Sequence, residues 1–297
     1  MRMRKTVPNH ASRAVEVTAR TTSGIREMPV AQKLNILKSA EKRTKHMKHP
    51  GLVSISFRSL TPAEIIPLAA GAGLHSIEWG ADVHCKPGDF AAAEQICALS
   101  EKHGTASCAY GSYYRAGEGE DVNADFTDIL ATAKALHTDI IRVWAGIHGS
   151  AEASSEQRAA VREDLARICA LAAPEGVKIS LECHNNTLTD DYNSALRLLD
   201  EVGCSNLTMY WQPNQFKSLD YNLESARALR DVVTNVHVFN WAGKEKYPLA
   251  GATDVWKRYV SLLEGSRYEH RYLLEFMPHG SPEELTAEAR SLAEGIL

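Results

Sequence analysis

The sequence contains no hydrophobic run that approaches the ~20 residues required for a membrane-spanning helix. Its N-terminal region also lacks the compact apolar stretch of a secretory signal. On these two absences we expect a cytoplasmic protein without a membrane partner.

Paired cysteine motifs are missing as well. The chain has six cysteines, scattered without a CxxC spacing, and this pattern indicates neither a zinc knot nor a disulfide framework. The GxGxxG signature of dinucleotide-binding folds is also absent. We expect the cysteines to be reduced and to serve packing.

The net charge of −4 hides a strong asymmetry along the chain. Residues 1–49 carry 12 Lys/Arg against 3 Asp/Glu, whereas residues 50–297 carry 21 against 34. A body this acidic repels phosphate backbones, so we expect no nucleic-acid partner. The basic leader has the Arg-rich composition of an organelle transit peptide, but we favour an N-terminal extension over 1–49 that is flexible or partly helical.

From residue 50 onward, short β-branched runs alternate with longer Ala/Leu/Glu-rich stretches that have helical spacing. The candidate strands are 52–57, 76–79, 106–110, 140–145, 178–183, 207–212, 235–241 and 272–277. Eight β/α units in about 250 residues predict a closed (β/α)8 barrel, the TIM barrel, as a single domain over 50–297. A doubly wound open sheet is the alternative, but it usually has fewer strands and a glycine-rich first turn.

The last four candidate strands each end with a polar side chain in the same phase. Alternation along a barrel strand turns Glu182, Gln212, His237 and Glu275 inward. Alone, each has an ordinary structural explanation, such as a hydrogen-bonded core histidine or a glutamate paired with an arginine. Adjacent strands lie ~4.8 Å apart, so four groups at one height can converge on one ion. Their shared phase predicts a divalent metal site at the barrel mouth, where enzymes of this architecture hold their chemistry.

The motifs LECHNN, YWQPN, VHVFNW and LLEF, together with the eight-unit rhythm, resemble the xylose-isomerase-like TIM barrel superfamily. This group of sugar phosphate isomerases and epimerases includes ketose 3-epimerases and inosose dehydratases. The resemblance covers about residues 50–297 and implies one divalent ion held by Glu182, Gln212, His237 and Glu275. Gln212 stands in the place of the family's usual aspartate.

The expected ligand set determines the expected metal. Two carboxylates, one imidazole and one amide neutralise a divalent cation, whereas a third carboxylate would leave a net negative charge. We therefore expect the ion to bind less tightly, and to act as a stronger Lewis acid, than it would with a third carboxylate. An oxygen-rich site with one nitrogen suits Mn²⁺ best, with Mg²⁺, Co²⁺ or Zn²⁺ as alternatives.

A cation chelated by a ketose carbonyl and its adjacent hydroxyl acidifies the C–H between them and stabilises the enediolate. With Glu182 and Glu275 as the acid/base pair, the predicted activity is a metal-dependent epimerase or isomerase of an unphosphorylated sugar or polyol. The alternatives are a keto-sugar or keto-cyclitol dehydratase at the same site, a non-catalytic sugar-binding barrel, and a hydrolase similar to apurinic-site endonucleases. Assembly into a homo-oligomer is left open.

Other residues near the strand ends are candidates for substrate binding. They are Glu78, Arg142, Trp144, His184, Asn186, Trp241 and Lys244. Each also has a structural explanation: an arginine inside a barrel often pairs with an acid, and Glu78 is a suitable partner for Arg142. The glycine-bearing, aromatic stretch 111–121 predicts a mobile cover over the pocket.

Overall fold

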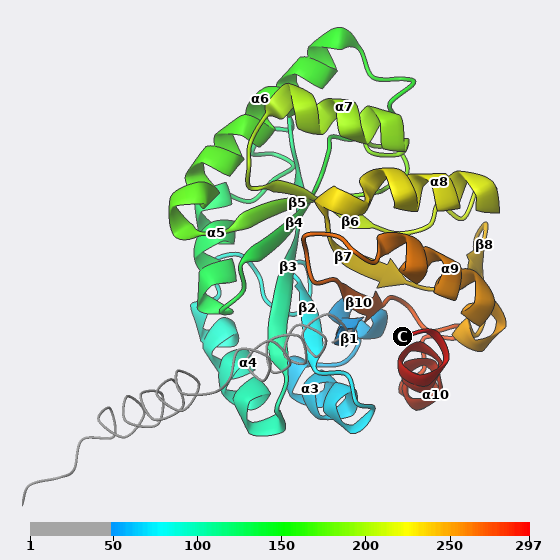
Figure 1. Cartoon of the computed structure of the whole chain (residues 1–297). Coiled ribbons are helices and arrows are strands. Elements are labelled where there is room, and N and C mark those ends of the chain that lie inside the picture. The colour runs from blue at the N-terminus through cyan, green and yellow to red at the C-terminus, as the bar shows by residue number, and fades with distance from the viewer. Residues whose placement is uncertain (1–48) are drawn as a thin grey trace, which may run out of the picture. The chain divides into compact units, whose positions relative to one another are not determined.

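The computed structural model describes residues 49–297, and in this part of the chain eight parallel strands close into a barrel (Figure 1). Around the barrel the strand order is β1-β10-β7-β6-β5-β4-β3-β2. The predicted (β/α)8 barrel is confirmed. The predicted extension over 1–49 lies outside the described residues, apart from its last residue.

The eight barrel strands all overlap predicted strands. They are β1 (His49–Val53), β2 (Ser76–Gly80), β3 (Ala106–Arg115), β4 (Ile140–Trp144), β5 (Lys178–Glu182), β6 (Leu207–Trp211), β7 (Val233–Val238) and β10 (Arg271–Leu274). The predicted first strand is only partly correct, because Ser54–Phe57 forms a 3-10 turn. The predicted strand 235–241 ends at Val238, and a small antiparallel hairpin of β8 (Trp241–Ala242) and β9 (Glu245–Lys246) follows.

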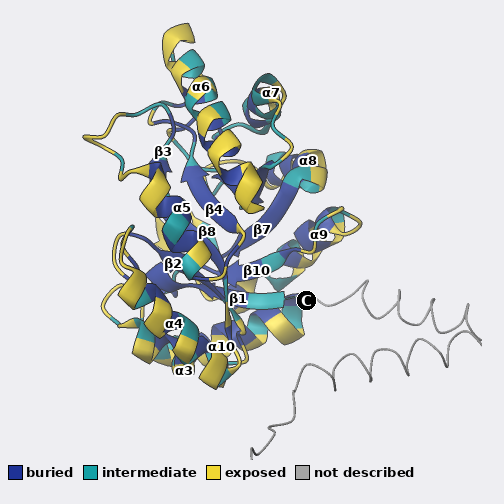
Figure 2. Ribbon diagram, turned by 90° about the vertical axis from the view of Figure 1, so that its left-hand side faces the viewer, coloured by how far each residue is buried: buried dark blue, intermediate teal, exposed yellow. Residues whose placement is uncertain are grey.

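Helices surround the barrel and bury one face each against the strands (Figure 2). They are α3 (Pro62–Gly71), α4 (Phe90–His103), α5 (Phe126–Ala135), α6 (Ser155–Ala172), α7 (Tyr192–Val202), α8 (Leu219–Leu229), α9 (Thr253–Leu263) and α10 (Leu285–Arg290), the last continued by a π-helical turn over Ser291–Ile296. Local signals set their ends. Thr61 and Glu64 form a capping box before α3, and α4 stops at Gly104, whose φ of 68° a side chain would disfavour.

The barrel interior is packed in two chemically different layers. A small apolar cluster fills part of it and consists of Val53, Ile55, Cys108, Ala109, Ile140, Tyr210 and Leu273. Beside it the hydroxyl of Ser180 lies 2.9 Å from those of both Thr208 and Thr234. These groups occupy the inward register, so the polar residues further along the same strands lie at the mouth.

The predicted mobile cover over 111–121 is wrong for its first half. Gly111–Arg115 belongs to β3, and Tyr113 lies there with a φ of 59°, an uncommon conformation for a bulky residue. The turn beyond it is fastened by Asn123, whose side chain bonds both the backbone N (2.7 Å) and the backbone O (2.9 Å) of Arg115. A strand with a local bulge thus replaces half of the expected loop.

None of the helices in the described part of the chain combines the length and the hydrophobicity that a membrane-spanning segment needs.

Candidate active site

Four polar side chains from consecutive strands meet at the barrel mouth. Glu182 ends β5, Gln212 follows β6, His237 lies in β7 and Glu275 follows β10. One ligand atom from each of Glu182, His237 and Glu275 lies within 4.8 Å of the others, and the Oε1 atom of Gln212 is 3.0 Å from Nδ1 of His237. His237 is fully buried, and Glu182 and Glu275 are 3% and 6% exposed. The structure therefore brings the four predicted metal ligands together.

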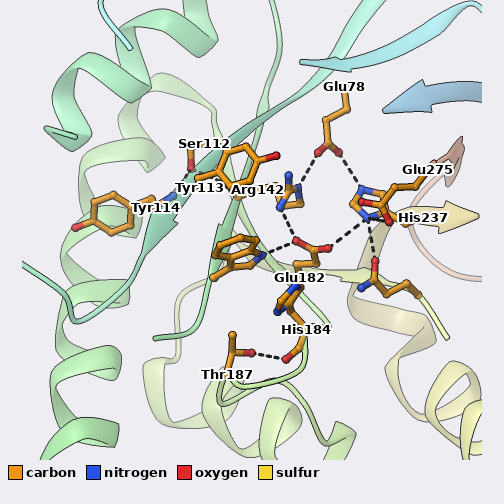
Figure 3. A network of polar contacts seen from close by, with 12 residues as sticks. Glu78, Ser112, Tyr113, Tyr114, Arg142, Glu182, His184, Thr187, His237 and Glu275 are labelled. Atoms are coloured by element: carbon orange, nitrogen blue, oxygen red, sulfur yellow. Dashed lines mark hydrogen bonds and ion pairs between the residues drawn. The ribbon is translucent and has the colours of Figure 1, made fainter. Parts of the chain in front are cut away.

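The two ring nitrogens of His237 face different partners (Figure 3). Nδ1 lies 3.5 Å from a carboxylate oxygen of Glu182 and 3.5 Å from one of Glu275. Nε2 points the other way, 3.3 Å from Oε2 of Glu78. Nδ1 is thus the nitrogen turned toward the cluster of candidate ligands.

Arg142 connects two of the acids inside the barrel (Figure 3). Its Nε donates to Oε1 of Glu78 at 2.7 Å, and its Nη1 forms an ion pair with Oε2 of Glu182. The same oxygen of Glu182 accepts a hydrogen bond from Nε1 of Trp144 at 2.6 Å. The suggested Glu78–Arg142 pair is present. Glu78 is fully buried, and each of its oxygens has a protein partner.

Burial and charge shift the ionisation of these groups strongly. Burial would raise the pKa of Glu78, but Arg142 and His237 hold it at about 2. The pKa of Glu182 also lies well below its usual range, because Arg142 and His237 outweigh the cost of burial. Burial would lower the pKa of His237, yet Glu275 and Glu78 raise it to about 10. Burial raises the pKa of Glu275 to about 7, against the opposing charge of His237.

These residues suit a divalent cation. Three buried carboxylates, those of Glu78, Glu182 and Glu275, lie around one guanidinium and one imidazole, so the acidic groups outnumber the basic ones. Ligand atoms on opposite sides of an ion of this kind are about 4 to 5 Å apart, which agrees with the 4.8 Å spread of the cluster. The donor set of carboxylates, an amide oxygen and an imidazole matches the preferences of Mn²⁺ and Mg²⁺.

The predicted substrate-binding residues are distributed unevenly around this cluster. The His184 ring lies 4.8 Å from the Trp144 ring, and Trp241 stacks on Phe239 with their ring centroids 4.3 Å apart. By contrast, Asn186 is exposed with a φ of 60°, and Lys244 is exposed in the turn between β8 and β9. Neither makes a contact with the cluster in the part of the chain that the structure describes.

Three neighbours of the site were not predicted. Tyr113 packs its ring 5.4 Å from the guanidinium of Arg142, and Phe276 directly follows Glu275 with a φ of 54°. Both rings also pack against the apolar cluster inside the barrel. The Nζ atom of Lys246 lies 4.5 Å from the Phe276 ring and 5.4 Å from the Trp241 ring. The position of Phe276 next to Glu275 in the sequence is a signal from which its place at the site can be predicted. No sequence signal predicts the hairpin that carries Lys246.

A polar pocket of about 350 Å³, measured with its opening to solvent, adjoins the cluster. Its walls are the loop after β5, with His184 and Asn185, and the loop after β6, with Gln212 and Asn214.

Comparison with known proteins agrees with this architecture. The chain matches the family described as Xylose isomerase-like TIM barrel over residues 66–294. A 3-dehydroshikimate dehydratase from Bacillus anthracis is 37% identical over 93 residues, which is 29% of this chain. The matched stretch spans only 33% of that curated relative.

Solved structures share the fold at lower identity. The probable 3-DHS dehydratase AsbF, involved in petrobactin synthesis in Bacillus anthracis, superposes with a TM-score of 0.68 at 22% identity, over 83% of this chain and 98% of AsbF. The 3-keto-D-glucoside 4-epimerase YcjR from E. coli superposes with a TM-score of 0.65 at 15% identity, over 82% of this chain and 99% of YcjR. By the family match, which covers most of the barrel, this chain belongs to the xylose isomerase-like TIM barrel family.

Proposed function

We propose that this protein is a metal-dependent lyase that removes water from a cyclic keto-polyol acid, and that 3-dehydroshikimate is the first substrate to test. The similarity to a 3-dehydroshikimate dehydratase supports the substrate class. Glu182, Gln212, His237 and Glu275 would hold the ion, with Mn²⁺ as the first choice. The ion supplies polarisation of the substrate carbonyl and stabilises negative charge on its oxygen.

The observation that carries the proposal is the unequal surroundings of the two candidate catalytic carboxylates. Oε2 of Glu182 accepts hydrogen bonds from both Arg142 and Trp144. Glu275 has only one ion-pair contact among the described side chains, to His237 at 3.5 Å. A group that accepts and releases protons needs a free oxygen, which Glu275 has. Both carboxylates would be ligands of the ion, but Oε2 of Glu182 is also held by Arg142 and Trp144. We therefore assign a single proton abstraction to Glu275 and favour it over a symmetrical exchange between two faces.

The reaction then has a simple balance. Glu275 takes the proton from the carbon next to the carbonyl, and the electron pair of that C–H bond forms a double bond to the following carbon. The hydroxyl on that following carbon leaves and is protonated to water. We assign this second proton to His184, whose ring lies against Trp144 beside Glu182.

Charge balance supports an acidic substrate. Glu78 and Arg142 neutralise each other, and a divalent ion would neutralise Glu182 and Glu275. The ammonium group of Lys246 lies over the Phe276 ring, and no carboxylate among the described residues is within ion-pair distance of it. A substrate carboxylate would find its counter-charge there.

An epimerase is the second candidate, because Glu182 and Glu275 lie at the same distance, 3.5 Å, from Nδ1 of His237. Two carboxylates that flank one point can remove a proton on one face of a carbon and return it on the other. The stacked rings of Trp241 and Phe239 would also suit a sugar.

One experiment in D₂O separates the two candidates. Loss of water from 3-dehydroshikimate, followed by tautomerisation, gives an aromatic dihydroxy acid that absorbs in the near ultraviolet. We expect this absorbance to appear with Mn²⁺, to vanish with chelator, and to fall by about 10²- to 10⁴-fold in Glu275→Gln. Metal-dependent entry of deuterium into a ketose or a recovered keto-polyol, without loss of water, would contradict the lyase and support the epimerase.

A further inference from the structure

Glu78 is the buried residue of this site that the proposed reaction does not use. It is fully buried on β2, across the barrel from β7, and neither of its oxygens is available to a substrate. Resting on the metal site of the proposed function, we propose that Glu78 is a positioning residue that makes Nδ1 of His237 the metal-binding nitrogen and, through Arg142, orients Glu182.

The contact with His237 determines the tautomer of the ring. The surrounding acids favour a protonated ring when no ion is bound, but a histidine that binds a metal must be neutral, with one N–H and one lone pair. An ionised carboxylate can only accept. The guanidinium of Arg142 pairs with Oε1 of Glu78 and keeps that carboxylate an acceptor. Oε2 of Glu78 therefore receives the proton on Nε2, 3.3 Å away, and the lone pair is left on Nδ1. Nδ1 is also the nitrogen that faces Glu182, Gln212 and Glu275.

The contact with Arg142 extends this control to a second ligand. Oε1 of Glu78 binds Nε of Arg142 at 2.7 Å, and the far end of the same guanidinium binds Oε2 of Glu182. With Oε2 occupied in this way, Oε1 of Glu182 is the oxygen turned toward His237. One buried carboxylate thus orients two of the four ligands.

The absence of a side chain at Gly111 leaves room for the ion pair between Glu78 and Arg142. A Cβ atom on Gly111 would lie 2.6 Å from Nη2 of Arg142 and 2.8 Å from Oε1 of Glu78, closer than real Cβ contacts. Gly111 has no positive φ, so the glycine is required for space and not for backbone conformation. The Glu78–Arg142 ion pair therefore packs directly against the backbone of β3 at Gly111. The substitution Gly111→Ala should displace this ion pair.

The test measures metal binding and the state of the ring separately from turnover. Calorimetric titration with Mn²⁺ is compared for the wild type, Glu78→Gln, Gly111→Ala and the matched control Glu288→Gln. Glu288 is another buried carboxylate with a backbone partner, the N–H of Leu249 at 3.0 Å, but it lies on α10 away from the site. We expect about 10- to 100-fold weaker binding in Glu78→Gln and Gly111→Ala, and wild-type binding in Glu288→Gln.

Nitrogen NMR of ¹⁵N-histidine-labelled wild-type protein with Zn²⁺ supplies a second measurement that does not depend on the folding of any Glu78 variant. The His237 signals are identified by their loss in His237→Gln. We expect the metal-induced shift on Nδ1 and a retained proton on Nε2. A metal-shifted Nε2, or Mn²⁺ affinity unchanged in Glu78→Gln, would overturn the role of Glu78 and leave the proposed function intact. Absence of metal binding in the wild type would overturn both.

Discussion

The indole N–H of Trp144 donates to Oε2 of Glu182, and the two atoms are 2.6 Å apart. A hydrogen bond to a charged, buried acceptor is worth about 1.5 to 3 kcal/mol, more than an ordinary one. Trp144→Phe keeps an aromatic ring and removes the donor, so we expect kcat/KM to fall by about 10- to 100-fold. Steady-state kinetics with the Mn²⁺-loaded protein measure this.

Trp211 offers a matched control for that substitution. Its Nε1 donates to the hydroxyl of Ser225 at 2.8 Å, and the side chain is fully buried among the outer core residues. Trp211→Phe should lower stability without changing kcat/KM. Equal kinetic losses in both variants would mean that Trp144 acts only through packing.

The charge of Lys246 can be tested by comparison with Lys244, the other lysine of the β8–β9 hairpin. Lys246→Met should raise KM for an acidic substrate by about 10-fold or more with little change in kcat, because an ion pair made equally in the ground and transition states is lost. Both lysines are exposed, but Lys246 lies over the Phe276 and Trp241 rings. Lys244→Met removes the same charge two residues away and should behave as wild type. Equal KM values in both variants would remove Lys246 from substrate binding.

Metal binding should also appear as thermal stability. A ligand present at about 100 times its Kd adds about 2.7 kcal/mol to the free energy of unfolding. For a domain of this size that corresponds to a rise in Tm of about 5 to 10 °C. We expect calorimetric scans with Mn²⁺ and with chelator to differ by this amount in the wild type. The same scans should coincide in His237→Gln, and a persistent difference would place the metal elsewhere.

His270 gives a prediction for pH that is independent of the site. It is 8% exposed, and burial lowers its pKa although the carbonyl oxygens of Leu263 and Thr234 lie near its ring nitrogens. Because the unfolded chain takes up a proton at a higher pH than the native protein, stability is full above about pH 6.5 and falls as the pH drops below it. Urea unfolding of the wild type at pH 7.5, 6.5 and 5.5 should show this loss.

The variant His270→Gln removes that titration, so its free energy of unfolding should fall less between pH 6.5 and 5.5 than that of the wild type. A slope identical to that of the wild type would assign the pH dependence to other groups, of which the buried His84, also with a lowered pKa, is the first to examine.

The barrel and the convergence of four side chains could be predicted from the sequence because strand alternation has a fixed period. Once 178–183 and 235–241 are strands, the inward direction of Glu182 and His237 follows from parity alone. The extension of β3 to Arg115 could not be predicted, because it depends on Tyr113 taking a positive φ within a strand. Local sequence preferences disfavour that conformation.

The role of Glu78 could not be predicted for a different reason. The sequence indicated a pair with Arg142, but the contact with His237 joins residues 159 positions apart across the barrel. Such contacts depend on side-chain reach and rotamer inside a closed interior, and no periodic pattern encodes these. The hairpin that carries Lys246 could not be predicted either, because β8 and β9 contain two residues each and are too short to show strand alternation.

The chain of contacts from His237 through Glu78 and Arg142 to Glu182 takes its members from β7, β2, β4 and β5, and so from both halves of the barrel. A fragment containing the first four β/α units would keep the Glu78–Arg142 pair without Glu182 and His237, and the complementary fragment would keep His237 without its proton acceptor. Half-barrels of this protein could not each retain part of the function. Metal affinity would instead report when two separately produced halves had joined correctly.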